Sequence, residues 1–157
     1  MPYRSNEPAP SPYLAVLPSA VMAWLVMLAA GLALGALGEF SLGHLDLMTL
    51  DEYAIAFLLT MPVPFALVVA IVYTPLVVGV RVVSSGKASP LAFGAACIVA
   101  APLAGLLLLA IGSLVWGPPR FAGGYMTFVP TLLAIALGGL AFGLAFGSIN
   151  RRGRFSS

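Results

Sequence analysis

Four long stretches of the chain are almost purely apolar, and short segments rich in charge, glycine or proline separate them. A helix that crosses a bilayer needs about 20 predominantly apolar residues, and each stretch is long enough. We therefore expect transmembrane helices at about 19–38, 50–83, 90–116 and 125–149. The pattern predicts an all-α, polytopic integral membrane protein, in which four transmembrane helices form two helical hairpins.

Capping residues indicate where two of these helices begin. Thr49 and Glu52 have the spacing of a capping box, in which each side chain bonds the backbone N–H of the other residue. Ser89 and Pro90 fit an N-cap followed by proline at the first helical position, where no N–H is needed. The second and third helices thus have start signals that do not depend on hydropathy.

Prolines inside the expected helices predict bends, because proline removes a helix hydrogen bond and clashes with the preceding turn. The second helix, at about 34 residues, would be about 50 Å long against a hydrocarbon core of about 30 Å. It contains Pro62, Pro64 and Pro75, and the third helix contains Pro102. Thr60, Pro62 and Pro64 form a possible functional kink, because unwound backbone coordinates ions in some transporters. The alternative is that these prolines are only structural.

The positive charges predict the orientation. The N-terminal tail 1–18, the link 84–89 with Arg81, and the basic tail 150–157 hold six of the seven Lys and Arg residues, and only Arg120 lies on the other side. Cytoplasmic segments of membrane proteins carry an excess of Lys and Arg. With an even number of spans, this bias predicts that both termini are cytoplasmic and that residues 19–149 form the membrane domain.

Aromatic residues are expected near both membrane surfaces, where Trp and Tyr are enriched. On the outer side the predicted belt consists of Trp116, Tyr125 and Tyr53. On the cytoplasmic side it consists of Tyr13 and Tyr73.

Composition excludes a soluble domain. The chain is 61% hydrophobic and 8% charged, with a mean hydropathy of +1.08, whereas about 25% of the residues in an average soluble domain are charged. Seven scattered cations form no basic stripe, so we expect no nucleic-acid partner. One cysteine, Cys97, permits no intrachain disulfide, and no cofactor motif is present. The alanine-rich, lysine-poor composition favours a multi-pass protein of a bacterial inner membrane.

The segment 39–52 holds four of the five acids and the single histidine. His44, Asp46 and Met48 are weak candidates for metal ligands, because imidazole, carboxylate and thioether groups all bind transition metals. One histidine is too few for a site without ligands from elsewhere. We therefore expect a solvated loop and no metal site.

Glycine recurs every fourth residue at Gly139, Gly143 and Gly147, and again at Gly31 and Gly35. Such spacing makes a flat face on which a second backbone can approach closely, a main source of helix association in lipid. This helix-packing interface has two interpretations. It joins another subunit, or it joins helices of the same chain.

Function follows from what the predicted spans lack. Away from the helix ends, where Asp51, Glu52 and Arg81 lie, none holds an ionisable acid, base or activated nucleophile of the kind that marks proton relays or hydrolysis in the membrane. We expect a small non-catalytic accessory or assembly subunit of a larger inner-membrane complex. Its expected partners are the lipid bilayer and another membrane protein or further copies of itself. The alternative is a small transporter or channel subunit, acting as an oligomer through the kinked second helix.

Overall fold

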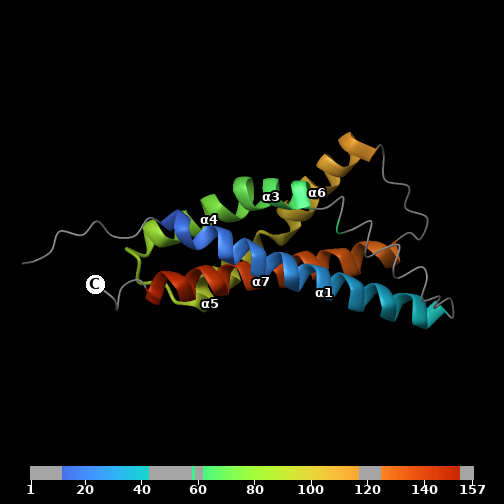
Figure 1. Cartoon of the computed structure of the whole chain (residues 1–157), viewed down its shortest axis with the longest axis horizontal. Helices are drawn as coiled ribbons and strands as arrows, with labels where there is room; N and C mark the ends of the chain where they lie inside the picture. Colours follow the sequence, from blue (N-terminus) through green and yellow to red (C-terminus); the bar gives the residue numbers. More distant parts are fainter. Residues whose placement is uncertain (1–11, 43–57, 59–61, 117–124, 153–157) are drawn as a thin grey trace, which may run out of the picture.

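The computed structural model describes residues 12–42, 58, 62–116 and 125–152, and all of its regular elements there are helical (Figure 1). The elements follow in this order: the 3₁₀ turn η1 (Pro12–Ala15), α1 (Val16–Leu42), α3 (Pro62–Val68), the π-helical turn η2 (Val69–Tyr73), α4 (Thr74–Val83), α5 (Pro90–Val99), α6 (Ala101–Trp116) and α7 (Tyr125–Arg152). The all-α class is confirmed for this part of the chain.

Three helical stretches are long and apolar enough to cross a membrane: Tyr13–Leu34, Pro62–Val83 and Thr131–Arg151. The pair α5 and α6 meets the same test together, although the two helices are bent by 50° where they meet. Counted as one broken span, this pair makes four. The described residues therefore contain three or four potential spans.

The first helix begins earlier than position 19. Residues from Pro12 onward are already helical, so Pro18 lies in the first turn of α1. Proline fits there because the first N–H groups of a helix have no partner within it. The hydroxyl of the fully buried Ser19 donates a 2.6 Å hydrogen bond to the carbonyl of Ala15, one turn back. Ser19 therefore lies inside the helix and bonds its backbone, and it is not the residue at which the helix begins.

The second helix is regular in α3 and α4 but widens into the π turn η2 just before Pro75. Proline at this position would press its ring against the carbonyl of Ile71 in a regular helix. A wider turn relieves that clash, and the N–H of Thr74 bonds the carbonyl of Val69. The bend predicted from Pro75 is thus a π turn. Pro62 and Pro64 occupy the first turn of α3.

The third helix begins as predicted, with the hydroxyl of Ser89 accepting a 3.2 Å hydrogen bond from the N–H of Ala92. It breaks at Ala100, two residues before Pro102, which becomes the second residue of α6. Pro102 cannot donate to the carbonyl of Ile98, so the helix ends there and restarts. Proline therefore acts here as the beginning of a new helix, tilted by 50° from the old one.

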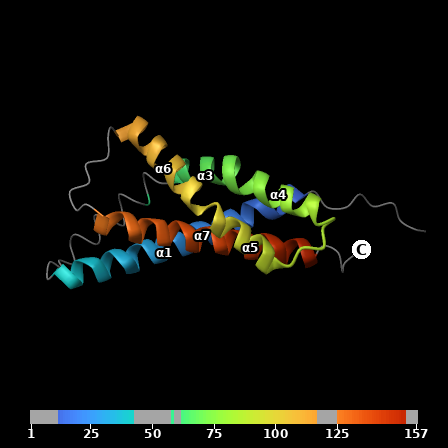
Figure 2. The ribbon, with the colours of Figure 1, turned by 180° about the vertical axis from the view of Figure 1, so that it is seen from behind.

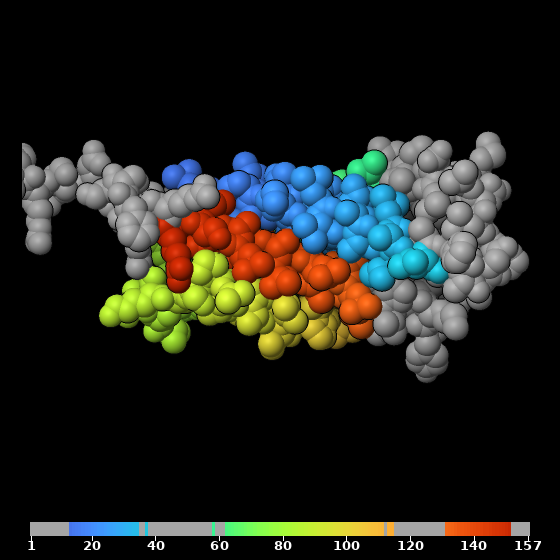
Figure 3. Space-filling model, turned by 90° about the horizontal axis from the view of Figure 1, so that it is seen from below, coloured from blue at the N-terminus to red at the C-terminus, as the bar shows by residue number. Residues whose placement is uncertain are grey.

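The last helix, α7, lies at the centre of the bundle. It packs along α1 on one side and α5 on the other, and Figure 3 shows it between them. Figures 1 and 2 both show α6 rising away from α7 and passing beside α3. The predicted pairing of neighbouring helices is therefore incomplete, because the first helix packs mainly on the last.

Aromatic rings fill the space between the second, third and fourth helices. Tyr73 stacks on Phe142 with ring centroids 5.6 Å apart, and Phe146 contacts both Phe142, at 6.4 Å, and Phe93, at 5.5 Å. All four side chains are at most 1% exposed. This row packs the described centre of the bundle closely.

Candidate functional site

The glycine stripe of α7 receives the backbone of α5. A Cβ built on Gly143 would collide with the carbonyl of Phe93 and would lie 2.6 Å from the nitrogen of Gly94. A Cβ on Gly147 would lie 2.6 Å from the Cα of Pro90. Contacts this short are possible only without a side chain. The stripe is thus occupied by a helix of its own chain and is not free for a partner.

The third glycine of the stripe, Gly139, makes room for a tyrosine. A Cβ there would lie 2.9 Å from the hydroxyl of Tyr73 and 3.1 Å from the carbonyl of Cys97. The tyrosine hydroxyl donates a long hydrogen bond, 3.4 Å, to the carbonyl of Ile135. Placing Tyr73 in the cytoplasmic aromatic belt was therefore wrong, because it lies in the middle of a span and finds its polar partner inside the protein. Tyr13, by contrast, is 64% exposed.

Gly31 of the first helix makes no close contact with another helix. A Cβ on Gly31 would meet no atom within 4 Å, and the surroundings of Gly35 lie outside the description. The contact with α1 is made instead by Gly138, where a Cβ would lie 3.1 Å from the Cβ of Met27 and 3.2 Å from the carbonyl of Ala23. Sequence reasoning missed Gly138. The sequence did contain a sign of this contact, because the small residue Ala134 lies four positions before Gly138 and therefore on nearly the same face of the helix.

Several predicted residues cannot be placed. His44, Asp46 and Met48 lie outside the described residues, as do Thr60 and the capping box at 49–52. Among the residues that the structure does describe, no group of three or more His, Cys, Asp or Glu side chains comes together. The statements about the metal ligands and the cap stay predictions, and only Pro62 and Pro64 of the proposed kink are seen.

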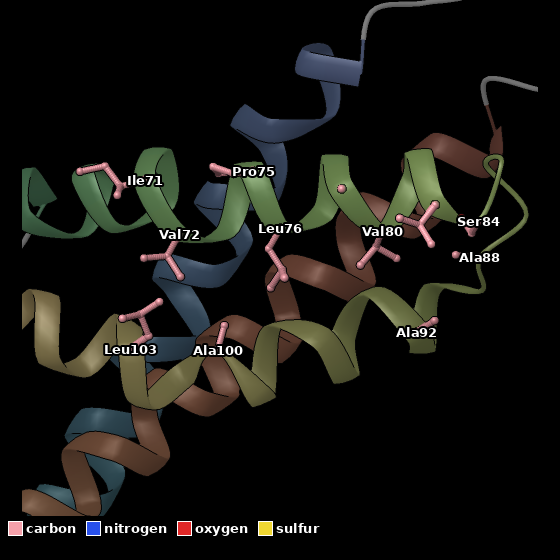
Figure 4. A pocket seen from close by; sticks show the side chains of 12 residues that line it. Ile71, Val72, Pro75, Leu76, Val80, Ser84, Ala88, Ala92, Ala100 and Leu103 are labelled. Atoms are coloured by element: carbon pink, nitrogen blue, oxygen red, sulfur yellow. The ribbon is translucent and has the colours of Figure 1, made fainter.

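A groove of about 750 Å³ runs between α4 and the α5–α6 pair (Figure 4). Its lining is apolar except for one serine and consists of Ile71, Val72, Pro75, Leu76, Gly79, Val80, Val83, Ser84, Ala88, Ala92, Ala100 and Leu103. Figure 4 shows Val72, Leu76 and Val80 pointing across it toward the third helix. Small residues on both walls leave the space open. No pattern in the sequence predicted this groove.

Both irregular stretches of backbone lie on the groove. The π turn contributes Ile71 and Val72, and the break in the third helix contributes Ala100. Irregular backbone at membrane depth is tolerated where it is buried in protein or lines a cavity. The sequence indicated both irregular stretches, because Pro75 and Pro102 each lie near the middle of their span.

One end of the groove is polar. There Ser84 and Ala88 flank the turn that joins the second and third helices. Arg81 lies one turn before Ser84, and its Nη1 is buried without a hydrogen-bond partner. Lys87 is exposed in the turn itself. Arg81 lies on the side of α4 away from the lining residues, about 150° around the axis, whereas Lys87 directly precedes the lining residue Ala88. The groove therefore has one exposed cation beside its end, and it suits a ligand with an apolar body and a negatively charged head.

No protein-family model, curated protein or solved structure matches the chain. Cys97 is fully buried, and no acid or histidine stands between positions 53 and 157 to activate it. The groove and its cationic mouth are the best candidate for a functional site.

Proposed function

We propose that the chain is a non-catalytic accessory or assembly subunit of a larger complex in a bacterial inner membrane. The observation that carries this proposal is the close packing of the described core. The aromatic row from Tyr73 to Phe93 and the backbone contacts of Gly143 fill the space between the described parts of the second, third and fourth helices. A chain with such a core supports binding to other membrane components more readily than catalysis or conduction.

The surface that supports a partner is the outer side of α6. After the bend at Ala100 this helix departs from α7 (Figure 2). Its apolar side chains include Leu106, which is 63% exposed, and Leu114, which is 86% exposed. The hydroxyl of Ser113 is already bonded to the carbonyl of Ala110, at 2.8 Å. This side of α6 presents no unpaired hydroxyl, and a transmembrane helix of another protein is the partner that it suits.

Site-specific photocrosslinking in intact membranes tests the proposal. A photoreactive amino acid at Leu106 or Ala110 should give one discrete, stoichiometric adduct, because a fixed partner covers that face. The same amino acid at Val21 or Leu25 of α1, each 52% exposed, is the control and should label only lipid. Equal labelling from both helices, or no protein adduct from α6, would contradict the proposal.

The alternative, a transporter or channel subunit working through the second helix, has one specific observation in its favour. The π turn before Pro75 and the break at Ala100 face the same groove, and discontinuous helices often mark transport sites. Since the described core of one chain is closely packed, conduction would require several copies. A photocrosslinked adduct of twice the 16.2 kDa chain mass, together with solute flux into liposomes containing only this protein, would favour this alternative.

A further inference from the structure

We propose that the groove between α4 and the α5–α6 pair binds an anionic phospholipid. One acyl chain lies along the groove, and the phosphate sits at the mouth beside Lys87. This inference does not rest on the accessory-subunit proposal, since it concerns a lipid rather than a protein.

The length of the groove matches one leaflet of a bilayer. Along α4 its lining runs from Ile71 to Ser84, which at 1.5 Å per residue is about 20 Å. Half of a hydrocarbon core is about 15 Å thick. Figure 4 shows Ile71 and Leu103 at one end and Ser84, Ala88 and Ala92 at the other. The inner end thus reaches the middle of the span, and the outer end reaches the turn where a headgroup would lie.

The lining is suited to a hydrocarbon chain. Eleven of its twelve residues carry no polar side-chain atom. Several are glycine or alanine, whose side chains are short enough to leave space for an acyl chain between the helices. A Cβ on Gly79 would meet no atom within 4 Å, which means that the space at this point is not filled by protein.

The cation at the mouth has no acidic partner on the described helices around it. After Glu52 the chain has no acidic residue, and before Glu39 it has only Glu7. Lys87 is exposed and directly precedes Ala88, which lines the groove. Arg81 lies about 150° around α4 from the lining residues, and its Nη1 is buried within the protein, so it does not face the groove. A phosphate at the mouth would pair with Lys87, and basic pockets between transmembrane helices are known to hold anionic headgroups.

The backbone of the turn holds this mouth in place. The N–H of Gly86 bonds the carbonyl of Arg81 at 2.7 Å, and the N–H of Ser85 bonds that of Val82 at 3.0 Å. This is a Schellman cap, which ends the helix with residues of positive φ, here Ser85 at 50° and Gly86 at 72°. Lys87 is therefore carried by an ordered turn, close to the start of α5.

Native mass spectrometry of the purified full chain can test the site. The protein is exchanged into detergent with equal amounts of dioleoylphosphatidylglycerol and dioleoylphosphatidylcholine, whose acyl chains are identical. The parent should retain one phosphatidylglycerol in preference to phosphatidylcholine. Lys87→Ala should lower that preference about fivefold, the effect of one cation near an anionic lipid surface. Equal retention of the two lipids by the parent would overturn the proposal.

A second pair of variants tests whether the acyl chain lies in the groove. Gly79→Leu fills the groove and should abolish retention of both lipids, while Gly31→Leu adds the same side chain at another open position and should leave retention unchanged. Circular dichroism and gel filtration establish that each variant is folded. Undiminished phosphatidylglycerol on folded G79L would exclude the groove as its site. Binding of a partner helix there instead would appear as protein adducts from a photoreactive group at Leu76, and would also overturn the proposal.

Discussion

At the scale of single residues, missing Cβ atoms determine how closely α7 approaches its neighbours. Gly143 and Gly147 face the backbone of α5, and Gly138 faces the backbone of α1. In lipid, where no hydrophobic effect drives helices together, such contacts supply much of the association energy. The adjacent residues Gly138 and Gly139 lie about 100° apart on the helix. One turn of α7 therefore serves two interfaces.

Gly143→Ala should destabilise the bundle by about 1–3 kcal/mol, the usual cost of overpacking, because its methyl group has no space beside Phe93. The matched control is Gly31→Ala, where a Cβ meets nothing within 4 Å. It should be neutral, or stabilising by up to about 1 kcal/mol, because alanine favours the helix. The measurement is the temperature at which the monomer peak is lost in gel filtration. Equal behaviour of the two variants would show that the stripe has no packing role.

At the scale of helices, the effect of a proline depends on its position. Pro18, Pro62 and Pro90 lie in first turns and leave their helices intact. Pro75, inside the second helix, is accommodated by a π turn. Pro102, inside the third, coincides with a break and a 50° bend. The last two cases shape the groove, so its walls depend on where proline interrupts hydrogen bonding.

Pro102→Ala should straighten the third helix, because alanine restores the N–H that bonds the carbonyl of Ile98. Spin labels at the exposed Leu91 and Leu114 should then move apart by about 3 Å, as calculated for two helical arms of this length with and without the bend. Pulsed electron resonance measures that distance. Pro90→Ala is the control and should not change it, and an unchanged distance in P102A would mean that packing alone bends the helix.

At the scale of the whole molecule, one central helix organises the bundle. α7 separates α1 from α5, and the turn at 84–89 joins the second helix to the third beside it (Figures 1 and 3). The buried side chains between the described helices are almost all apolar. The fully buried hydroxyl of Ser19 is hydrogen-bonded, whereas Oγ1 of Thr74 and Nη1 of Arg81 are buried without a partner. The interior therefore contributes packing, while binding falls to the outer surfaces.

The predicted orientation can be tested with single cysteines at Ser41, Ser85, Gly123 and Ser156. In whole cells an impermeant thiol reagent should label positions 41 and 123, whereas 85 and 156 should react only after lysis, as the distribution of Lys and Arg requires. The native Cys97 is fully buried, so it should contribute little background. External labelling of S156C would disprove an even number of spans with cytoplasmic termini.

The sequence by itself determined the class of the protein and many local features. Long apolar stretches with so few charges are typical of helices that span a membrane, and this signal does not depend on the tertiary arrangement. The N-cap at Ser89 and the irregularities near Pro75 and Pro102 also followed, because caps and prolines act through backbone groups within a few residues. Orientation and function remain predictions from charge and from the absence of ionisable groups.

Only the tertiary structure decided which surfaces meet. The spacing of Gly139, Gly143 and Gly147 shows that they share one face, but not whether that face meets a partner or α5. The burial of Tyr73 likewise depends on the space left by Gly139, a residue 66 positions away. The groove between α4 and α5 arises from two helices whose irregular turns lie opposite each other. Such relations between distant segments leave no periodic signal in a single sequence, since hydropathy in lipid-facing and protein-facing residues is the same.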